Sequence, residues 1–207
     1  AENTTLGGDN GVGAAMMMAL MEDDAPFGEL EFLFTVDEEV GMVGARGLEP
    51  NLIKSKVLIN LDTEEWGEIY ISCAGGGDSL LNIALNRVEA DPKDVTLEVS
   101  ISGLKGGHSG CDIHLGRGSA NRIIGRLLKA AYNVAPFKIR CLTGGNKRNS
   151  ISDNAKTCLD IAPENKEKFE AEIAKCAKQV ANELSKTDPG FKYEVNVVAD
   201  KSGRVKP

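Results

Sequence analysis

Carboxylate side chains occur at three places in the first half of the chain where they could bind a metal ion. Asp9 lies in a glycine-rich turn. Glu38 and Glu39 directly follow one apolar run, and Asp62 follows another. Carboxylates that meet at one place repel one another unless a cation neutralises them, so together these groups predict a divalent metal site. Taken singly, each group is also typical of a solvated loop, and carboxylates alone suit Mg, Mn, Ca or Zn.

Glu38 and Glu39 are adjacent, and adjacent side chains at the end of a strand point in different directions. They can therefore have different roles, one as a metal ligand and the other as a general base beside the attacking water. Two metal ions about 3.5–4 Å apart that share a hydroxide are the usual arrangement for hydrolysis of this kind. The pair thus favours a metal-dependent hydrolase.

One histidine, His108, stands in the glycine-rich segment of residues 103–110 (GLKGGHSG). Flanking glycines let the backbone approach a ligand closely, so His108 is a candidate hydrogen-bond donor or acid. A lone histidine in a loop is also commonly just solvated. His114 lacks such a frame and is interpreted as structural.

Motifs of several other enzyme classes are missing from the sequence. It has no Gly-x-x-x-x-Gly-Lys-Ser/Thr phosphate loop and no Gly-x-Ser-x-Gly nucleophile elbow. Residues 7–13 (GGDNGVG) do not match Gly-x-Gly-x-x-Gly and do not follow a recognisable strand. Dinucleotide binding is therefore only weakly supported.

The elements of the first half are expected to bring the carboxylates to one edge of a sheet. Residues 12–21 are apolar on every side and predict a buried helix, with Asp9, Asn10 and Gly11 at its capping positions. Residues 30–36 and 57–61 predict buried strands, and residues 69–72 a further one. This alternation predicts an α/β unit, in which ligands bind beyond the carboxyl ends of the strands.

The second half has a different pattern. Strands are predicted at residues 95–101, 136–142, 155–161 and 191–198. Helices are predicted at residues 120–131, behind a capping Ser119, and after Pro163. The order β-α-β-β-α-β is that of the ferredoxin-like fold. Residues 79–92 are ambiguous between a loop and an edge strand.

The charge distribution also indicates two domains, divided near residue 78. The formal net charge of the 207 residues is −7. Residues 1–78 hold 16 acidic and 3 basic residues, whereas residues 79–207 hold 15 acidic and 21 basic ones. The basic residues are dispersed among acids, and the predicted strands lack paired exposed aromatic residues, so nucleic-acid binding is not expected. No run of about 20 apolar residues predicts a membrane-spanning helix.

Five scattered cysteines, none in a Cys-x-x-Cys pair, favour reduced thiols in a cytoplasmic protein. A zinc finger and a disulfide-bonded secreted scaffold are correspondingly disfavoured. The chain begins with Ala and starts as if in the middle of a domain, so it is interpreted as a piece of a longer protein, truncated at both ends.

Four motifs in this order, GGDNGVG, TVDEEVGMVGA, INLDTEE and GLKGGHSG, resemble those of the di-zinc peptidase family that includes carboxypeptidase G, peptidase T and the aminoacylases. They are most similar to the bacterial branch that cleaves Xaa-His dipeptides. The resemblance implies part of a mixed-sheet α/β catalytic domain in residues 1–78 and a ferredoxin-like lid in residues 79–207. It also implies two zinc ions, or Mn or Co in their place, a small peptide substrate and a cytoplasmic homodimer joined through the lid.

The resemblance implies a role for each matching residue. Asp9 is similar to the carboxylate that bridges both zinc ions, and Glu39 and Asp62 are similar to ligands of one zinc each. Glu38 resembles the general base that deprotonates the bridging water. His108 resembles the lid histidine that stabilises the tetrahedral oxyanion, which in this family often belongs to the partner subunit.

Asn149, in the segment GGNKRNSI, is similar to a lid asparagine that contacts the substrate. This match is less close, because the family usually has Pro where the chain has Ser152. The chain also lacks the family's His-x-Asp motif and its C-terminal histidine, so it is expected to carry three of five metal ligands. It is therefore expected to be inactive alone and to bind zinc weakly.

Other functions remain open at this point. A tripeptide aminopeptidase or an aminoacylase of the same family would carry the same motifs. A non-catalytic module, in which the ferredoxin-like part pairs edge to edge with a copy of itself, is an alternative from another class.

Overall fold

The computed structural model describes residues 8–24, 26–63, 65–73 and 75–198. The chain forms two compact units, Ala1–Leu81 and Asn82–Pro207. The boundary between them lies close to residue 78, where the charge of the sequence changes sign. No helix within the described ranges is both long enough and apolar enough to cross a membrane.

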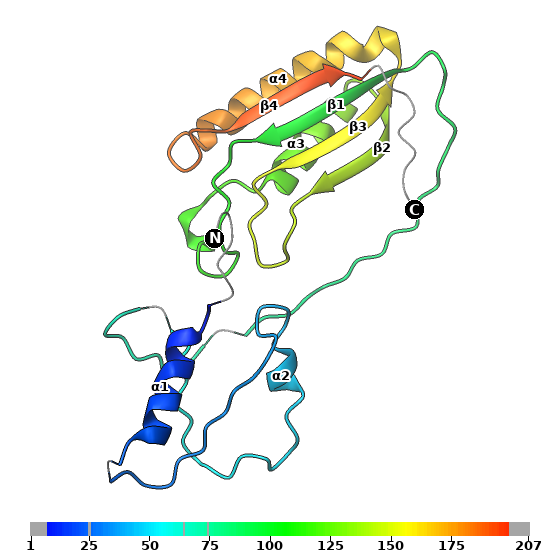
Figure 1. Ribbon diagram of the computed structural model, residues 1–207. Helices are drawn as coiled ribbons and strands as arrows, with labels where there is room; N and C mark the ends of the chain where they lie inside the picture. The colour runs from blue at the N-terminus through cyan, green and yellow to red at the C-terminus, as the bar shows by residue number, and fades with distance from the viewer. Residues whose placement is uncertain (1–7, 25, 64, 74, 199–207) are drawn as a thin grey trace. The chain divides into compact units, whose positions relative to one another are not determined.

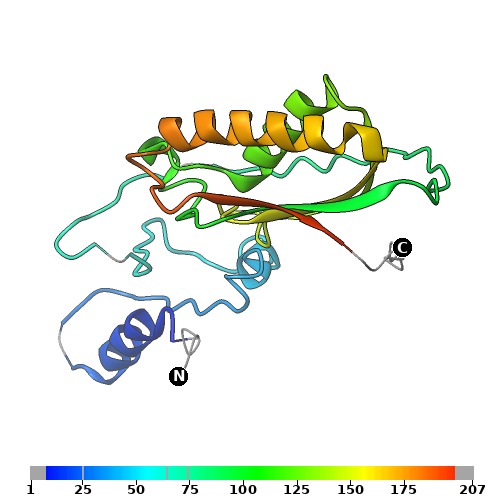
Figure 2. The same ribbon diagram turned by 90° about the horizontal axis from the view of Figure 1, so that it is seen from above.

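Four strands of the second unit form one antiparallel sheet in the order β2-β3-β1-β4 (Figure 1). Both long helices lie on the same face of this sheet (Figure 2). The β-α-β-β-α-β order confirms the predicted ferredoxin-like arrangement, and the α/β class of the chain is likewise as expected. The elements are β1 (Val95–Ser102), η1 (Ile113–Leu115), α3 (Ala120–Tyr132), β2 (Phe137–Gly144), β3 (Ala155–Ile161), η2 (Pro163–Asn165), α4 (Lys166–Glu183) and β4 (Lys192–Val197).

The core of the second unit lies between the sheet and the helices. Alternate residues of β1 and β3 point into it, and the apolar residues of α3 and α4 recur every three or four positions and so form one stripe. Phe169 is fully buried and makes an edge-to-face contact with Phe137, with ring centroids 5.4 Å apart. The larger apolar side chains that are fully buried are Leu97, Val99, Ile101, Ile124, Leu127, Leu159, Ile161, Phe169, Ile173 and Val180.

The opposite face of the sheet is polar. The buried carboxylate of Asp160 accepts both a hydrogen bond from Thr96 Oγ1 at 2.7 Å and a forked contact from Arg140 Nε at 2.6 and 2.7 Å. Beside it, Lys156 forms an ion pair with Glu98 on the neighbouring strand β1. The sheet thus has one apolar face, covered by helices, and one face with ion pairs across its strands.

In the first unit the predicted helix is present as α1 (Gly11–Glu22), and a short helix α2 (Val43–Arg46) follows. Asn10 caps α1, its side chain accepting a hydrogen bond from Gly13 N at 2.9 Å. The expected burial of this helix is wrong: of its residues only Gly13 is buried, and Met18 is 59% exposed. The helix is apolar on every side, and the described part of its unit covers only a small portion of that surface.

The strands predicted at residues 30–36, 57–61 and 69–72 are also wrong, because the described residues before β1 form no ladder. A strand needs a neighbour for its backbone hydrogen bonds, and the described part of this unit supplies none. A side chain, and not a ladder, joins two segments of this unit. The Glu31 carboxylate accepts hydrogen bonds from the backbone amides of Lys54 at 3.0 Å and Ser55 at 2.6 Å. Residues 79–92 likewise form no strand.

Candidate functional site

The glycine-rich loop between β1 and α3 is held at both ends by one buried carboxylate. Asp188 is 1% exposed, and its two oxygens accept hydrogen bonds from Lys105 N and Gly118 N, each at 2.8 Å. Burial opposes the ionisation of Asp188, but these backbone amides outweigh it and hold the pKa of the carboxyl below its ordinary value. The loop is therefore anchored to the connection between α4 and β4 by an ionised side chain.

Gly103 opens this loop, and glycine is required there. Its φ is +75°, and a Cβ at this position would collide with the carbonyl oxygen of Gly190. Within the loop, Asp112 Oδ2 accepts hydrogen bonds from His108 N at 2.9 Å and from Arg117 Nη1 at 3.3 Å. These contacts fix the backbone at His108.

The imidazole of His108 is oriented by the loop backbone. Its Nδ1 accepts hydrogen bonds from the amides of Gly110 and Cys111, both at 3.1 Å. Because both partners are donors, Nδ1 carries no hydrogen, and the hydrogen of the neutral ring is on Nε2. The side chain is exposed, so Nε2 can donate to a ligand.

The structure brings His108 and Asn149 onto adjacent backbone segments. Ser109 N donates to Asn149 O at 2.8 Å, and Ile151 N donates to Gly107 O at 2.8 Å. Between these two bonds, His108 and Ser150 form an isolated antiparallel bridge. The loop before α3 and the loop between β2 and β3 are thus joined by backbone hydrogen bonds.

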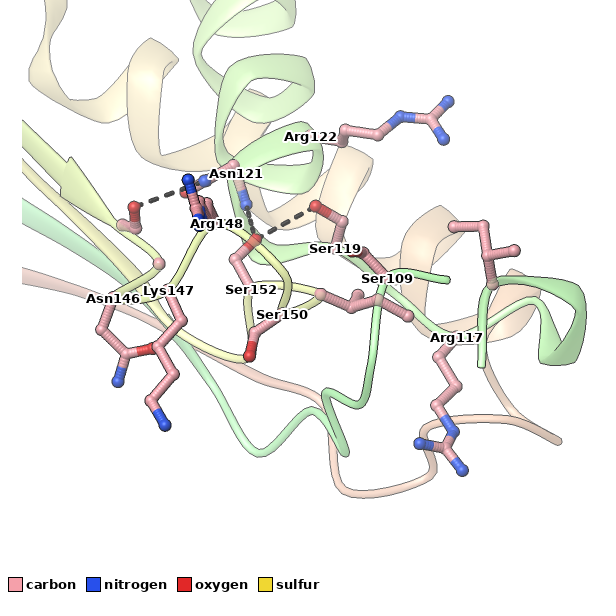
Figure 3. Close-up of a pocket in the computed structure, with 14 residues that line it drawn as sticks. Ser109, Arg117, Ser119, Asn121, Arg122, Asn146, Lys147, Arg148, Ser150 and Ser152 are labelled. Atoms are coloured by element: carbon pink, nitrogen blue, oxygen red, sulfur yellow. Dashed lines mark hydrogen bonds between the residues drawn. The ribbon is translucent and has the colours of Figure 1, made fainter. Parts of the chain in front are cut away.

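Beside this junction lies a cavity of about 460 Å³ (Figure 3). Four cationic residues and no carboxylate line it. The cavity therefore has a positive lining in the part of the molecule that also carries His108 and Asn149. Its polar and charged lining residues are Ser109, Arg117, Ser119, Asn121, Arg122, Asn146, Lys147, Arg148, Ser150 and Ser152.

Ser152 joins the wall of this cavity to the start of α3. Its hydroxyl accepts a hydrogen bond from Asn121 N at 3.1 Å and contacts the Ser119 hydroxyl at 3.1 Å (Figure 3). Its carbonyl oxygen accepts from Ala120 N at 2.8 Å. Ser119 occupies the predicted capping position, but its side chain makes no capping bond. A distant serine thus satisfies the first amides of the helix.

The predicted carboxylates of the first unit are all exposed. Asp9 precedes the capping Asn10, whose Nδ2 donates to Leu61 O at 2.8 Å, so the segments that carry Asp9 and Asp62 are in contact. Glu38 and Glu39 lie in the turn before α2, where Met42 N donates to Glu38 O at 2.8 Å. The structure therefore joins two of the three carboxylate segments by a direct contact.

In the described residues, no three side chains of His, Cys, Asp or Glu are gathered so that they could hold a metal ion. Oxygen donors of this kind are chemically suited to a divalent cation. In the described residues, the carboxylates of the three segments are not gathered into a ligand set.

The sequence and the structure of this chain are similar to those of known proteins. Residues 99–188 match the family model described as a peptidase dimerisation domain. The chain is 36% identical over 201 residues to the cytosol non-specific dipeptidase of Escherichia coli, an alignment that covers 97% of this chain and 41% of that protein. The solved structure of aminoacylhistidine dipeptidase from Vibrio alginolyticus matches with a TM-score of 0.72 and 36% identity, over 96% of this chain and 41% of that one.

The chain is a homologue of these dipeptidases. The expected resemblance is thereby confirmed. An uncharacterised protein of Bacillus subtilis, YqjE, is also similar, with 26% identity over 202 residues, 94% of this chain and 49% of that protein. The chain thus spans less than half the length of the curated relatives that it matches.

Sequence reasoning did not identify the cationic lining of the cavity. Arg117 and Arg122 flank the start of α3, whereas Lys147 and Arg148 lie in the loop between β2 and β3. In the sequence these residues look like dispersed surface charges. The adjacent residues Lys147 and Arg148, next to Asn149, were the one local indication of this positive charge in the sequence.

Proposed function

We propose that residues 1–207 are part of a metal-dependent dipeptidase that hydrolyses Xaa-His dipeptides. The main support is the 36% identity to two proteins named as dipeptidases, extending over nearly the whole chain. One of these relatives is named for aminoacylhistidine substrates. In this proposal the chain supplies one portion of the active site of a protein of the relatives' length.

The proposed metal ligands are Asp9, Glu39 and Asp62, with zinc as the expected ion, two per site, and Mn or Co as alternatives. A bound divalent ion would polarise the substrate carbonyl and make water more acidic. Glu38 is the proposed general base, whose carboxylate takes a proton from the attacking water and passes it to the leaving amine. The remaining ligands would come from outside this sequence.

His108 is the proposed stabiliser of the tetrahedral oxyanion. The support is its hydrogen-bonding pattern: with Nδ1 accepting from two backbone amides, Nε2 is the donor and faces solvent. Asn149 is the proposed substrate contact, because its segment is paired with that of His108. The cationic cavity beside them suits the terminal carboxylate of a dipeptide.

A direct test uses the gene product of the relatives' length that contains this sequence. It should hydrolyse alanyl-histidine, lose that activity on chelation and regain it with Zn, Mn or Co. Residues 1–207 alone, assayed in parallel, should show no hydrolysis. Robust turnover by residues 1–207, after contaminating enzyme is excluded, would show that the assumed ligand set is incomplete or incorrect.

Dimerisation through residues 79–207 is proposed as well. It is supported by the match of residues 99–188 to the peptidase dimerisation domain, and by the edge strands β2 and β4, each of which pairs with one neighbour within the described residues. The same observations favour the second candidate function, a non-catalytic dimerisation module. Sedimentation of residues 79–207 tests both, and a strict monomer at high protein concentration would contradict both.

A cytoplasmic location is also proposed. It is supported by the word cytosol in the name of the E. coli relative and by the five cysteines, which are all unpaired. Fractionation of cells that express the native gene would test it, and recovery of the protein in the membrane or extracellular fraction would contradict it.

A further inference from the structure

Two cysteines lie directly opposite each other on the polar face of the sheet. Cys141 in β2 pairs in register with Cys158 in β3, next to the irregularity between Ile139 and Cys141. Directly opposed residues of antiparallel strands have Cα atoms about 4.5–5.5 Å apart, which is within the range of about 4.4–6.8 Å found for disulfides. The register alone therefore permits a cross-strand bond.

The side chain of Cys158 also contacts the neighbouring strand β1, where its thiol donates to Glu98 Oε2 at 4.0 Å. Burial raises the pKa of the Cys158 thiol, and the adjacent Cys141 side chain raises it further. Cys141 is exposed whereas Cys158 is partly covered, so an oxidant reaches Cys141 first.

We propose that Cys141 and Cys158 are a dithiol modification site that closes to a disulfide when the protein meets a small-molecule disulfide such as oxidised glutathione. The thiolate of Cys141 attacks one glutathione sulfur, the glutathione S–S bond breaks, and one glutathione leaves as a thiolate. The thiolate of Cys158 then attacks Cys141 Sγ and releases the second glutathione. Two protein thiols are thereby oxidised and one glutathione disulfide is reduced.

The bond would link the two strands three ladder pairs before the loop formed by residues 145–154. This loop carries Asn149 and the helix-capping Ser152, and it lies between the two cysteines in the sequence. With the pair reduced, the two strands are joined by their ladder and by the Arg140–Asp160 contact, whereas the oxidised pair adds a covalent link. This inference depends on the fold of the second unit and not on the proposed dipeptidase activity.

The test uses the full chain with Cys73→Ser and Cys111→Ser, which removes the other two exposed thiols. After incubation with oxidised glutathione, free thiols are alkylated and the protein is digested with trypsin. Residues 141–147 and 157–166 are each released as a peptide by cleavage at Arg140, Lys147, Lys156 and Lys166. The expected result is that these two peptides are linked, lack two hydrogens, and separate on reduction, while the buried Cys176 is recovered as a free thiol.

The Cys158→Ser variant of the same protein is the matched control. Without Cys158 the reaction should stop at the mixed disulfide between Cys141 and glutathione, and this species should accumulate. Accumulation of that mixed disulfide to the same extent when Cys158 is present would overturn the proposal. A Cys141–Cys141 bond between two chains as the main product would also overturn it. The unsubstituted chain, digested in the same way, checks that the serine substitutions have not altered the outcome.

Discussion

The backbone amide of Ser109 donates a 2.8 Å hydrogen bond to the carbonyl oxygen of Asn149. The two residues are forty positions apart in the sequence, yet this bond and the bridge between His108 and Ser150 join their loops. The residues proposed for oxyanion stabilisation and for substrate contact, His108 and Asn149, therefore lie on two backbone segments that are hydrogen-bonded to each other. A change in either loop should therefore alter the position of both side chains.

Glu38→Ala, made in the protein of the relatives' length, should reduce turnover of a Xaa-His dipeptide by at least about 10²-fold, because the proton-accepting carboxylate is removed. Bound metal, measured by atomic emission, should stay largely in place. Glu49→Ala is the control, since Glu49 is another exposed carboxylate of the same unit. Loss of metal together with activity would assign Glu38 as a ligand instead.

His108→Ala should lower kcat by about 10²- to 10³-fold and change KM little, because the Nε2 donor acts on charge that develops in the transition state. The metal content should not change. His114→Ala is the matched control, since His114 is also exposed and lies in η1 of the same connection. Equal losses in the two variants would indicate a structural role for the loop histidines.

Asp188→Ala should lower the free energy of unfolding by about 2–4 kcal/mol, because it leaves the amides of Lys105 and Gly118 without their acceptor. Urea unfolding followed by circular dichroism measures this. Glu164→Ala, at an exposed position, should change stability by less than about 0.5 kcal/mol.

The stabilisation by Asp188 should also depend on pH. The pKa of Asp188 in the folded chain is lowered from its ordinary value of 3.8, so the folded state favours the ionised form. The contribution of Asp188 to stability is therefore complete at pH values above its ordinary pKa, and it is lost as the pH falls through the lowered pKa of the folded chain. The difference between the parent chain and Asp188→Ala should thus be constant near neutrality and shrink in acid. A difference that grows on acidification would contradict this assignment.

Ser152→Ala should destabilise the second unit by about 1 kcal/mol, because the amide of Asn121 loses its capping hydroxyl. Ser119→Ala should cost less, since the Ser119 side chain does not cap the helix. Each variant removes one of the two hydroxyl groups that contact each other. The midpoints of their thermal unfolding can therefore be compared directly. A larger loss for Ser119→Ala would reverse the assignment.

The second unit could be predicted from the sequence because its elements carry their own periodicity. The residues of 95–101 alternate, and the stripe of 120–131 recurs at helical spacing, so each segment specifies both its type and its buried face. Those signals depend only on nearby residues. The resulting order of elements then leaves few topologies, and the ferredoxin-like one is observed.

The first unit could not be predicted in the same way. Residues 57–61 have the composition of a buried strand, but a strand also needs a partner, and its partner is not specified by its own sequence. Val57 and Leu58 are 78% and 79% exposed in the structure. The capping role of Ser152 was missed for a similar reason, because it depends on a contact between residues about thirty positions apart.

The polar face of the sheet limits how a second molecule can bind to this unit. A partner lying flat against it would have to remove water from the Lys156–Glu98 pair and to pack over the Arg140–Asp160 contact without disturbing it. Removing water from paired ions costs several kcal/mol for each ion. A flat apolar surface makes no interaction with these ions that would compensate for this cost. Association is thus directed away from that face, toward the strand edges or the helices, which restricts the geometries that any assembly of this chain can adopt.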